Sequence, residues 1–415
     1  MGDMLRFLKA LSGNPKTCLL TEPFWSIPFN MFFPFVTLYM FAIGLDDVEI
    51  GTLLTVGMFA NFIMALFGGV AVDKFGRRKT LIVGDFFAWS VPVLLWAFSQ
   101  NFWWFLTASL FNSVSQLAMV SFECNWQDNL KEHKLPKLIN WFHIFFLTSI
   151  FFVLIPGYFI ERYSVEPVMR VIYLFAFVSM TSRLVILIFF LKETKRGKER
   201  IEATRDKTIL QLMLGYKEVF FQIIRSKSMV GLLILIPMVS IFQMITGTFF
   251  ALYATQDLKI GESFIAYFPV IRAGVALLFF LFIQNRLGRF NTRRLMCVGV
   301  VLYMVGHGML LVAPPQNTLW LVAYVLVDAW ASALFLPRLD DLVFSSIDPT
   351  ERARCRSLIV MVGLAVSSPF GYLAGLLSDM DRRLPFAFNM LLFICIIYFV
   401  LFKLHFKTPE SSQGV

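Results

Sequence analysis

Long apolar runs separated by short polar segments account for most of this chain. Crossing the ~30 Å hydrocarbon core of a bilayer takes about 20 apolar residues in a helix, and each run is close to that length. The pattern therefore predicts an all-α membrane protein with twelve transmembrane helices. The predicted spans are 23–43, 50–72, 80–99, 102–125, 139–160, 167–191, 229–254, 263–285, 295–312, 318–344, 357–377 and 385–405.

One long polar stretch, residues 192–227, separates the sixth span from the seventh. It is rich in Lys and Arg. Apolar residues recur at helical spacing from Ile209 to Ile223, which is typical of an amphipathic helix on a membrane surface. We therefore expect an N-terminal six-helix half (1–191), a basic cytoplasmic linker with an amphipathic helix (192–227) and a C-terminal six-helix half (228–415).

Composition agrees with a membrane protein, and the basic residues predict its orientation. Of the 415 residues, 58% are hydrophobic and 15% are charged, whereas soluble proteins carry about 25% charged residues. Most of the 37 Lys and Arg residues lie near the termini or in loops that follow even-numbered spans. Because such loops stay on the cytoplasmic side, both termini are expected to be cytoplasmic in the cell membrane. The net charge of +10 then requires no nucleic-acid partner.

The residues that often carry chemistry show no pattern of a metal, cofactor or enzyme site. The five cysteines are scattered without a C-x-x-C pair, and the four histidines are equally dispersed. These spacings predict neither a disulfide framework nor a metal site. We expect no cofactor, no metal and no enzymatic activity.

The loop between the second and third predicted spans is the most distinctive segment. It fits the pattern G-x-x-x-D-[RK]-x-G-R-[RK] through Gly69, Asp73, Lys74, Gly76, Arg77 and Arg78. This loop resembles the signature loop of the major facilitator superfamily. The resemblance implies a secondary transporter that works by alternating access and is built from two pseudo-symmetric six-helix halves.

The second half resembles a repeat of the first. Leu38-Tyr39 lies near the end of the first span and Leu252-Tyr253 near the end of the seventh, and an acidic turn and an apolar run follow each pair. The second of these runs ends in N-R-L-G-R at residues 285–289, which resembles a degenerate copy of the signature loop.

The resemblance also implies a gating role for the signature loop. Asp73 would face the positive N-terminal end of a helix from the other half. Arg77 would pair with Asp73 or with an acid at the end of the fourth span, for which Asp128 is the first candidate and Glu123 the second. Such a latch would hold the cytoplasmic side closed until the halves rock.

Two charged residues, Arg272 and Asp328, lie near the middle of the eighth and tenth spans, at similar depth for a rise of 1.5 Å per residue. A charge inside a span costs at least ~2.5 kcal/mol on insertion scales, so the two are expected to neutralise each other. Either they line a substrate cavity, with Asp328 as carrier of a coupling proton, or they form a fixed structural ion pair.

Three amides, Asn30, Gln116 and Gln243, lie at middle depth in spans one, four and seven. In the superfamily these spans and the tenth line the cavity, which implies substrate contacts. The alternative is hydrogen bonding between helices. A structural role is expected instead for Asp85, Arg183 and His307.

The leading hypothesis is a secondary active transporter for a small organic solute, with proton coupling through Asp328 as a further hypothesis. Uptake of a polar, sugar-like solute and export of amphiphilic compounds are both left open. The alternative class is a transporter-like sensor that binds ligand without flux. We expect a monomer in the lipid bilayer.

Overall fold

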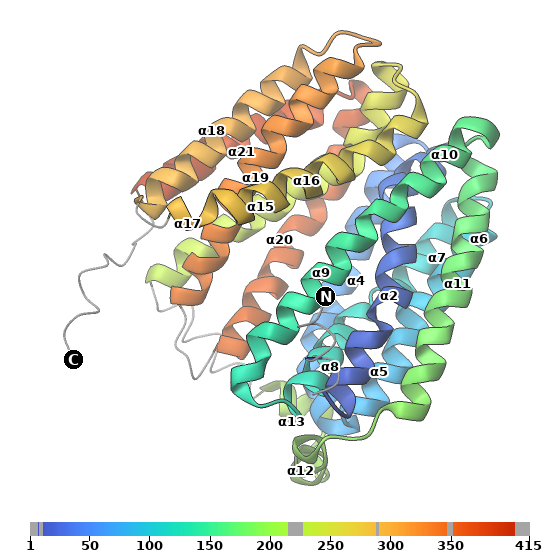
Figure 1. Ribbon diagram of the computed structural model, residues 1–415, viewed down its shortest axis with the longest axis vertical. Coiled ribbons are helices and arrows are strands. Elements are labelled where there is room, and N and C mark those ends of the chain that lie inside the picture. Colours follow the sequence, from blue (N-terminus) through green and yellow to red (C-terminus); the bar gives the residue numbers. More distant parts are fainter. Residues whose placement is uncertain (1–6, 8–10, 215–226, 288–289, 347–351, 403–415) are drawn as a thin grey trace. The chain divides into compact units, whose positions relative to one another are not determined.

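The computed structural model describes residues 7, 11–214, 227–287, 290–346 and 352–402. Throughout these residues the regular structure is helical, and 12 helices are long and apolar enough to cross a membrane. The predicted all-α membrane protein with twelve spans is therefore confirmed (Figure 1).

The first six spans contain, in chain order, α2 (Asn14–Phe32), η1 (Phe33–Phe35) and α3 (Val36–Ala42); α4 (Asp47–Phe75); α5 (Arg77–Asp85), η2 (Phe86–Ser90) and α6 (Val91–Ala97); α7 (Phe102–Asn112) and α8 (Ser115–Gln127); α9 (Leu135–Ile150), η4 (Phe151–Val153) and α10 (Leu154–Tyr163); and α11 (Val165–Phe190). Three short helices lie outside these spans: η3 (Glu132–Lys134), α12 (Lys195–Thr204) and α13 (Ile209–Leu214).

The last six spans contain α15 (Lys227–Leu252) with η5 (Tyr253–Asp257); η6 (Glu262–Ala266) with α16 (Tyr267–Phe282); α18 (Thr292–Leu311); α19 (Thr318–Ser346); α20 (Arg352–Met380); and α21 (Leu384–Phe402). The short helix α17 (Gln284–Leu287) follows α16. Gly288 and Arg289 of the predicted signature-loop copy lie outside the described residues.

Contacts between helices divide the chain into two compact units. The first holds Met1–Lys217 and Gly261–Tyr267, and the second holds Glu218–Ile260 and Phe268–Val415. The helices α12 and α13 pack against α4, so the described start of the polar linker belongs to the first unit. Of the predicted amphipathic helix at 209–223, the part beyond Leu214 lies outside the described residues.

Each unit contains an equivalent internal hydrogen bond, which the tyrosine of its Leu-Tyr pair donates. In the first unit the Tyr39 hydroxyl donates a hydrogen bond to the Trp96 carbonyl oxygen, 2.7 Å away. In the second unit the Tyr253 hydroxyl donates to the Leu310 carbonyl oxygen at 3.0 Å. Both bonds join residues 57 positions apart. Each ties the end of one span to the end of the next span but one, as expected for pseudo-symmetric halves.

The first span begins earlier than its hydropathy predicts, at Asn14 rather than near Pro23. The reason lies in hydrogen bonds to the segment after α11. The Asn14 side chain donates to the Lys192 carbonyl oxygen (2.7 Å) and accepts from the Lys192 amide (3.0 Å). Packing along α11 therefore stabilises polar turns of α2 that would not form a span by themselves.

Candidate functional site

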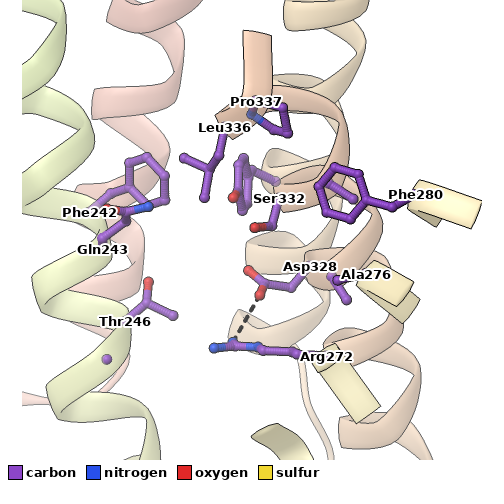
Figure 2. A pocket seen from close by; sticks show the side chains of 14 residues that line it. Phe242, Gln243, Thr246, Arg272, Ala276, Phe280, Asp328, Ser332, Leu336 and Pro337 are labelled. Atoms are coloured by element: carbon purple, nitrogen blue, oxygen red, sulfur yellow. Dashed lines mark ion pairs between the residues drawn. The ribbon is translucent and has the colours of Figure 1, made fainter. Parts of the chain in front are cut away.

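A cavity of about 350 Å³ lies among α15, α16, α18 and α19 of the second unit. Its walls carry an arginine and an aspartate, several hydroxyl groups, one side-chain amide, and aromatic and aliphatic side chains (Figure 2). The lining residues are Phe242, Gln243, Thr246, Gly247, Arg272, Ala276, Phe280, Tyr303, Asp328, Ala329, Ser332, Ala333, Leu336 and Pro337.

Helical spacing explains why these residues meet. Asp328 and Ser332 lie one turn apart on α19, and Arg272 and Ala276 lie one turn apart on α16. Residues four apart share a helix face, so each helix turns one such face toward the cavity. Gln243 enters the lining from α15 and is exposed. Three of the predicted site residues, Gln243, Arg272 and Asp328, are thus brought together.

The charged pair in this cavity is the one expected from the sequence. Arg272 Nη2 lies 2.9 Å from Asp328 Oδ2. The two side chains differ in accessibility, since Arg272 is 38% exposed and Asp328 only 8%. Although Nη2 is close enough for an ion pair, Nη2 and Nε of Arg272 are both buried and neither has hydrogen-bond geometry to any acceptor among the described residues. The contact is therefore an ion pair that leaves donor capacity on the guanidinium.

A buried polar network supports the cavity wall at Thr246. His307 is fully buried, as its structural assignment predicts, and its Nδ1 lies 3.1 Å from the Tyr303 carbonyl oxygen. A carbonyl oxygen only accepts, so Nδ1 carries the hydrogen and Nε2 is an acceptor. Asn389 Nδ2 (3.2 Å) and Thr246 Oγ1 (3.3 Å) both approach Nε2. These bonds fix the position of the Thr246 hydroxyl beside the cavity.

The predicted amides of the first half make hydrogen bonds inside the first unit. Asn30 Nδ2 donates to the Ser26 carbonyl oxygen at 2.8 Å, one turn back along α2. Gln116 Nε2 donates to Asn61 Oδ1 at 3.1 Å, which links α8 to α4. Bonding between helices, the alternative considered for Gln116, is therefore present in this structure.

The signature loop is a tight turn between α4 and α5, centred on an ion-pair cluster. Gly76 ends α4 with φ +89°, a backbone conformation that favours glycine. Arg77 Nε lies 2.9 Å from Asp128 Oδ2, and Arg77 Nη1 lies 3.3 Å from Asp73 Oδ1. Arg77 thus contacts both acids proposed for it, and of the candidates at the end of the fourth span it is Asp128 that it meets.

Glu193, just beyond α11, caps the N-terminus of α5. Its Oε1 accepts a hydrogen bond from the Arg77 amide and its Oε2 accepts one from the Arg78 amide, each at 3.0 Å. An anion is favoured at this position because the first amides of a helix have no partner inside it. The next residue, Thr194, donates to Asp128 Oδ2 at 2.9 Å and caps α12. One short segment thus connects the loop, the fourth span and α12.

A second buried charge cluster lies among α2, α5 and α11. Arg183 Nη1 is 3.5 Å from Asp85 Oδ2, and Arg183 Nη2 is 4.0 Å from Glu22 Oε2. The three side chains are each at most 10% exposed. Arg183 also lies over the Phe122 ring, 4.9 Å from its centroid. This arrangement agrees with the structural role expected for Asp85 and Arg183.

Sequence reasoning missed two hydroxyl groups of the cavity that helical spacing could have found. Thr246 follows Gln243 by three residues and Ser332 follows Asp328 by four, so each shares a helix face with a predicted site residue. It also missed Glu193 and Glu22, whose surroundings the sequence does not reveal.

Comparisons with known proteins place these features in context. A family model described as Major Facilitator Superfamily matches residues 26–363. A comparison with curated proteins gives no match.

Among solved structures, the chain is similar to the nucleoside transporter NupG, with a TM-score of 0.71 and 15% identity over 95% of this chain and 100% of that chain. A POT family transporter in complex with 5-aminolevulinic acid has a TM-score of 0.74 and 13% identity over 96% of each chain. The inward-open xylose transporter XylE from E. coli has a TM-score of 0.68 and 15% identity over 95% of this chain and 97% of that chain. At these identities the similarity shows a shared fold.

Proposed function

Because this chain belongs to the Major Facilitator Superfamily, we propose that it is a secondary active transporter that moves a small organic solute across the membrane by alternating access. The Arg272–Asp328 ion pair at the wall of a cavity carries the proposal. Charged groups inside membrane spans are costly and mark substrate and ion pathways. In folds built from such repeats, substrate sites lie near the middle of the bilayer.

The proposed substrate contacts come from both halves. Gln243, Arg272 and Asp328 would bind the solute from the second half, and Asp328 would carry a coupling proton. Asn30 and Gln116 would contribute from the first half, where a solute has to compete with their present hydrogen bonds. Such competition is feasible because an intramolecular hydrogen bond contributes only about 0.5–1.5 kcal/mol net.

We further propose that the signature loop gates the cytoplasmic side. The tight turn at Gly76 and the two ion pairs of Arg77 support this role, because they join the ends of α4, α5 and α8 at one point. A latch needs only a few kcal/mol of differential contact to invert a two-state balance. The gating residues would be Gly69, Asp73, Lys74, Gly76, Arg77, Arg78 and Asp128.

The chain is a multi-pass membrane protein. We propose that it is a monomer in the cell membrane with both termini in the cytoplasm, as the distribution of its Lys and Arg residues favours. The solutes named for its structural neighbours, a nucleoside, xylose and 5-aminolevulinic acid, belong to different chemical classes, so the fold by itself does not select among them.

Flux in proteoliposomes tests the proposal. The purified protein would be reconstituted and offered sugars, nucleosides, amino acids, organic acids and amphiphilic compounds, each with and without a pH gradient. We expect one class to be transported, with acceleration by the gradient that Asp328→Asn abolishes. Vesicles of known orientation would separate uptake of a sugar-like solute from export of an amphiphile. A compound that binds but is never transported would instead identify a sensor.

A further inference from the structure

We propose that the solute is an organic anion, a small monocarboxylate with an apolar or aromatic body, whose acidic group binds Arg272 in the second-unit cavity. This inference rests on the proposed transport function, which it deepens by naming the substrate class. Four observations on the cavity support it: the exposed partner of the ion pair, the free donors, the apolar wall and the charge balance.

The exposed partner of the ion pair is the arginine. Arg272 is 38% exposed, whereas the Asp328 side chain is 8% exposed. Figure 2 shows the guanidinium extending beneath Asp328 toward Thr246, across one end of the cavity. Of the two charged side chains, the cation is therefore the more accessible one. An anion is attracted at this point and an organic cation is repelled.

The guanidinium has donors to spare. It carries five N–H groups in a planar fork that matches a carboxylate. Its Nη2 lies 2.9 Å from Asp328 Oδ2, and Nε and Nη2, both buried, make no hydrogen bond with acceptors in the described part of the chain. A small movement of the side chain would let a second carboxylate take two parallel hydrogen bonds. An uncharged hydroxyl or amide would exploit this geometry less well.

The rest of the cavity is suited to an apolar body. Phe242, Phe280 and Leu336 line it together with several alanines. In Figure 2, Leu336 and Pro337 lie at the end opposite Arg272. The volume of about 350 Å³ is at the small end of the range of about 300–1,000 Å³ that is usual for ligand pockets. A compact acid with its apolar part toward Leu336 fits this polarity better than a sugar does.

Charge balance then couples the anion to one proton. Arg272 and Asp328 together are neutral, and an added carboxylate would leave one uncompensated negative charge inside a span. Neutrality returns when the solute carboxylate replaces Asp328 Oδ2 at the guanidinium and Asp328 takes one proton from water. Binding of the anion should therefore tighten as the pH falls, by at most about tenfold per pH unit for one coupled proton.

The other titratable groups around Asp328 are consistent with Asp328 as the group that takes the coupled proton. Among the described residues, the titratable or charged groups that interact with it are Arg272 on α16, Tyr303 and His307 on α18, and Tyr324 on α19. From α15 the cavity receives the neutral Gln243 and Thr246. His307 has both ring nitrogens engaged, with Nδ1 as donor to Tyr303. Asp328 is thus the carboxylate in direct contact with the cation that the solute would occupy.

The test is a thermal-shift assay on the purified full-length protein with matched probes of one size and three charges. Benzoate, phenylacetate and isovalerate would each be compared with the corresponding amide and amine, at about pH 7.5 and about pH 5.5. We expect at least one acid to raise Tm while its amide and amine do not, with a larger shift at the lower pH. Arg272→Gln should abolish that shift.

A second variant is needed because Arg272→Gln leaves Asp328 without its cation and can fail to fold. The double variant Arg272→Gln with Asp328→Asn is neutral and should fold, and it should respond to no acid. Arg338→Gln is the matched control, because Arg338 is another arginine of the second unit that does not line the cavity. It should keep the response to acids.

Several results would overturn the proposal. These are no shift with any acid, a shift with the amines that persists in Arg272→Gln, a response to phosphate or sulfate but not to carboxylates, or a response to acids that survives the double variant. Flux separates this failure from failure of transport itself. If a sugar or an amide is transported and no acid is, the substrate class is wrong and the transporter stands. If an acid binds through Arg272 and no solute is transported, the ligand class stands and the transport function fails.

Discussion

At the residue scale, the cluster of Glu22, Asp85 and Arg183 holds two carboxylates around one guanidinium in a nearly solvent-free place. Removing the arginine would leave both acids buried without a cation. Breaking a buried ion pair in this way costs about 3–5 kcal/mol. We therefore expect Arg183→Leu to lower the free energy of unfolding by about that amount, read as a large drop in Tm in detergent.

The matched control for this prediction is Asp85→Asn. It removes one acid and leaves one carboxylate with one guanidinium, so its Tm should fall much less than that of Arg183→Leu. If the two variants have equal Tm values, the cluster does not depend on charge compensation by Arg183. The packing of Arg183 over Phe122 would then be its main contribution.

The same scale shows which residues the sequence can predict. Arg272 and Asp328 could be paired in advance because helical rise converts position in a span into depth, and two opposite charges at one depth favour each other. Glu193 could not be placed in this way, because it lies in a basic polar segment that is expected to be solvated. Its role depends on where the chain returns after α11. Glu22 lies just before the predicted start of the first span, which in fact begins at Asn14.

At the element scale, Glu193 stabilises the first turn of α5 with two carboxylate oxygens. Losing a helix cap costs about 0.5–2 kcal/mol. We expect Glu193→Ala to lower stability by about that amount and Glu193→Gln, which keeps one acceptor oxygen, to lower it less. Hydrogen exchange at the Arg77 and Arg78 amides gives a local readout. Unchanged protection of these amides in Glu193→Ala would contradict the cap.

The packing of α18 on α19 depends on a glycine. A Cβ added at Gly299 would lie 3.0 Å from Phe335 Cβ and 3.3 Å from the Ala331 carbonyl oxygen, and neither atom can move independently of α19. Overpacking of this kind costs about 1–3 kcal/mol, so Gly299→Ala should lower Tm. Gly308→Ala on the same helix is the control, since nothing lies within 4 Å of its added Cβ. Equal changes in Tm for the two substitutions would show that helix propensity, and not packing, determines the change.

Elements differ in how far their bounds follow from hydropathy. Most spans begin and end within a few residues of the predicted positions, because each needs about 20 apolar residues to cross the hydrocarbon core and polar residues mark its ends. The π-helical turns η2 and η5 were not predicted, and neither was the 3-10 helix η6. Such local departures depend on packing against neighbouring helices, which hydropathy does not encode.

At the scale of the whole molecule, the gating proposal distinguishes two acids that look alike in the sequence. The Asp128 side chain is 6% exposed and that of Asp73 is 32% exposed, and both contact Arg77. An ion pair contributes more when it is shielded from water. We expect Asp128→Asn to change solute flux and Tm more than Asp73→Asn does.

Glu123→Gln serves as the control in this comparison, because Glu123 is the other acid considered at the end of the fourth span. Flux unchanged in both Asp73→Asn and Asp128→Asn, with the proteins folded, would remove the latch. A larger effect of Glu123→Gln than of Asp128→Asn would show that Glu123, and not Asp128, is the acid of the latch.

The attachment of α12 and α13 to α4 bears on how the protein could be made in two pieces. A break before Lys192 would take Glu193 away from α5 and leave the Arg77 and Arg78 amides uncapped. A break after Leu214 would keep these contacts within one fragment. Co-expressed fragments should therefore complement each other when the chain is cut after Leu214 and fail when it is cut before Lys192. The first part of the linker between the halves, up to Leu214, therefore belongs structurally to the first half as its carboxyl-terminal extension.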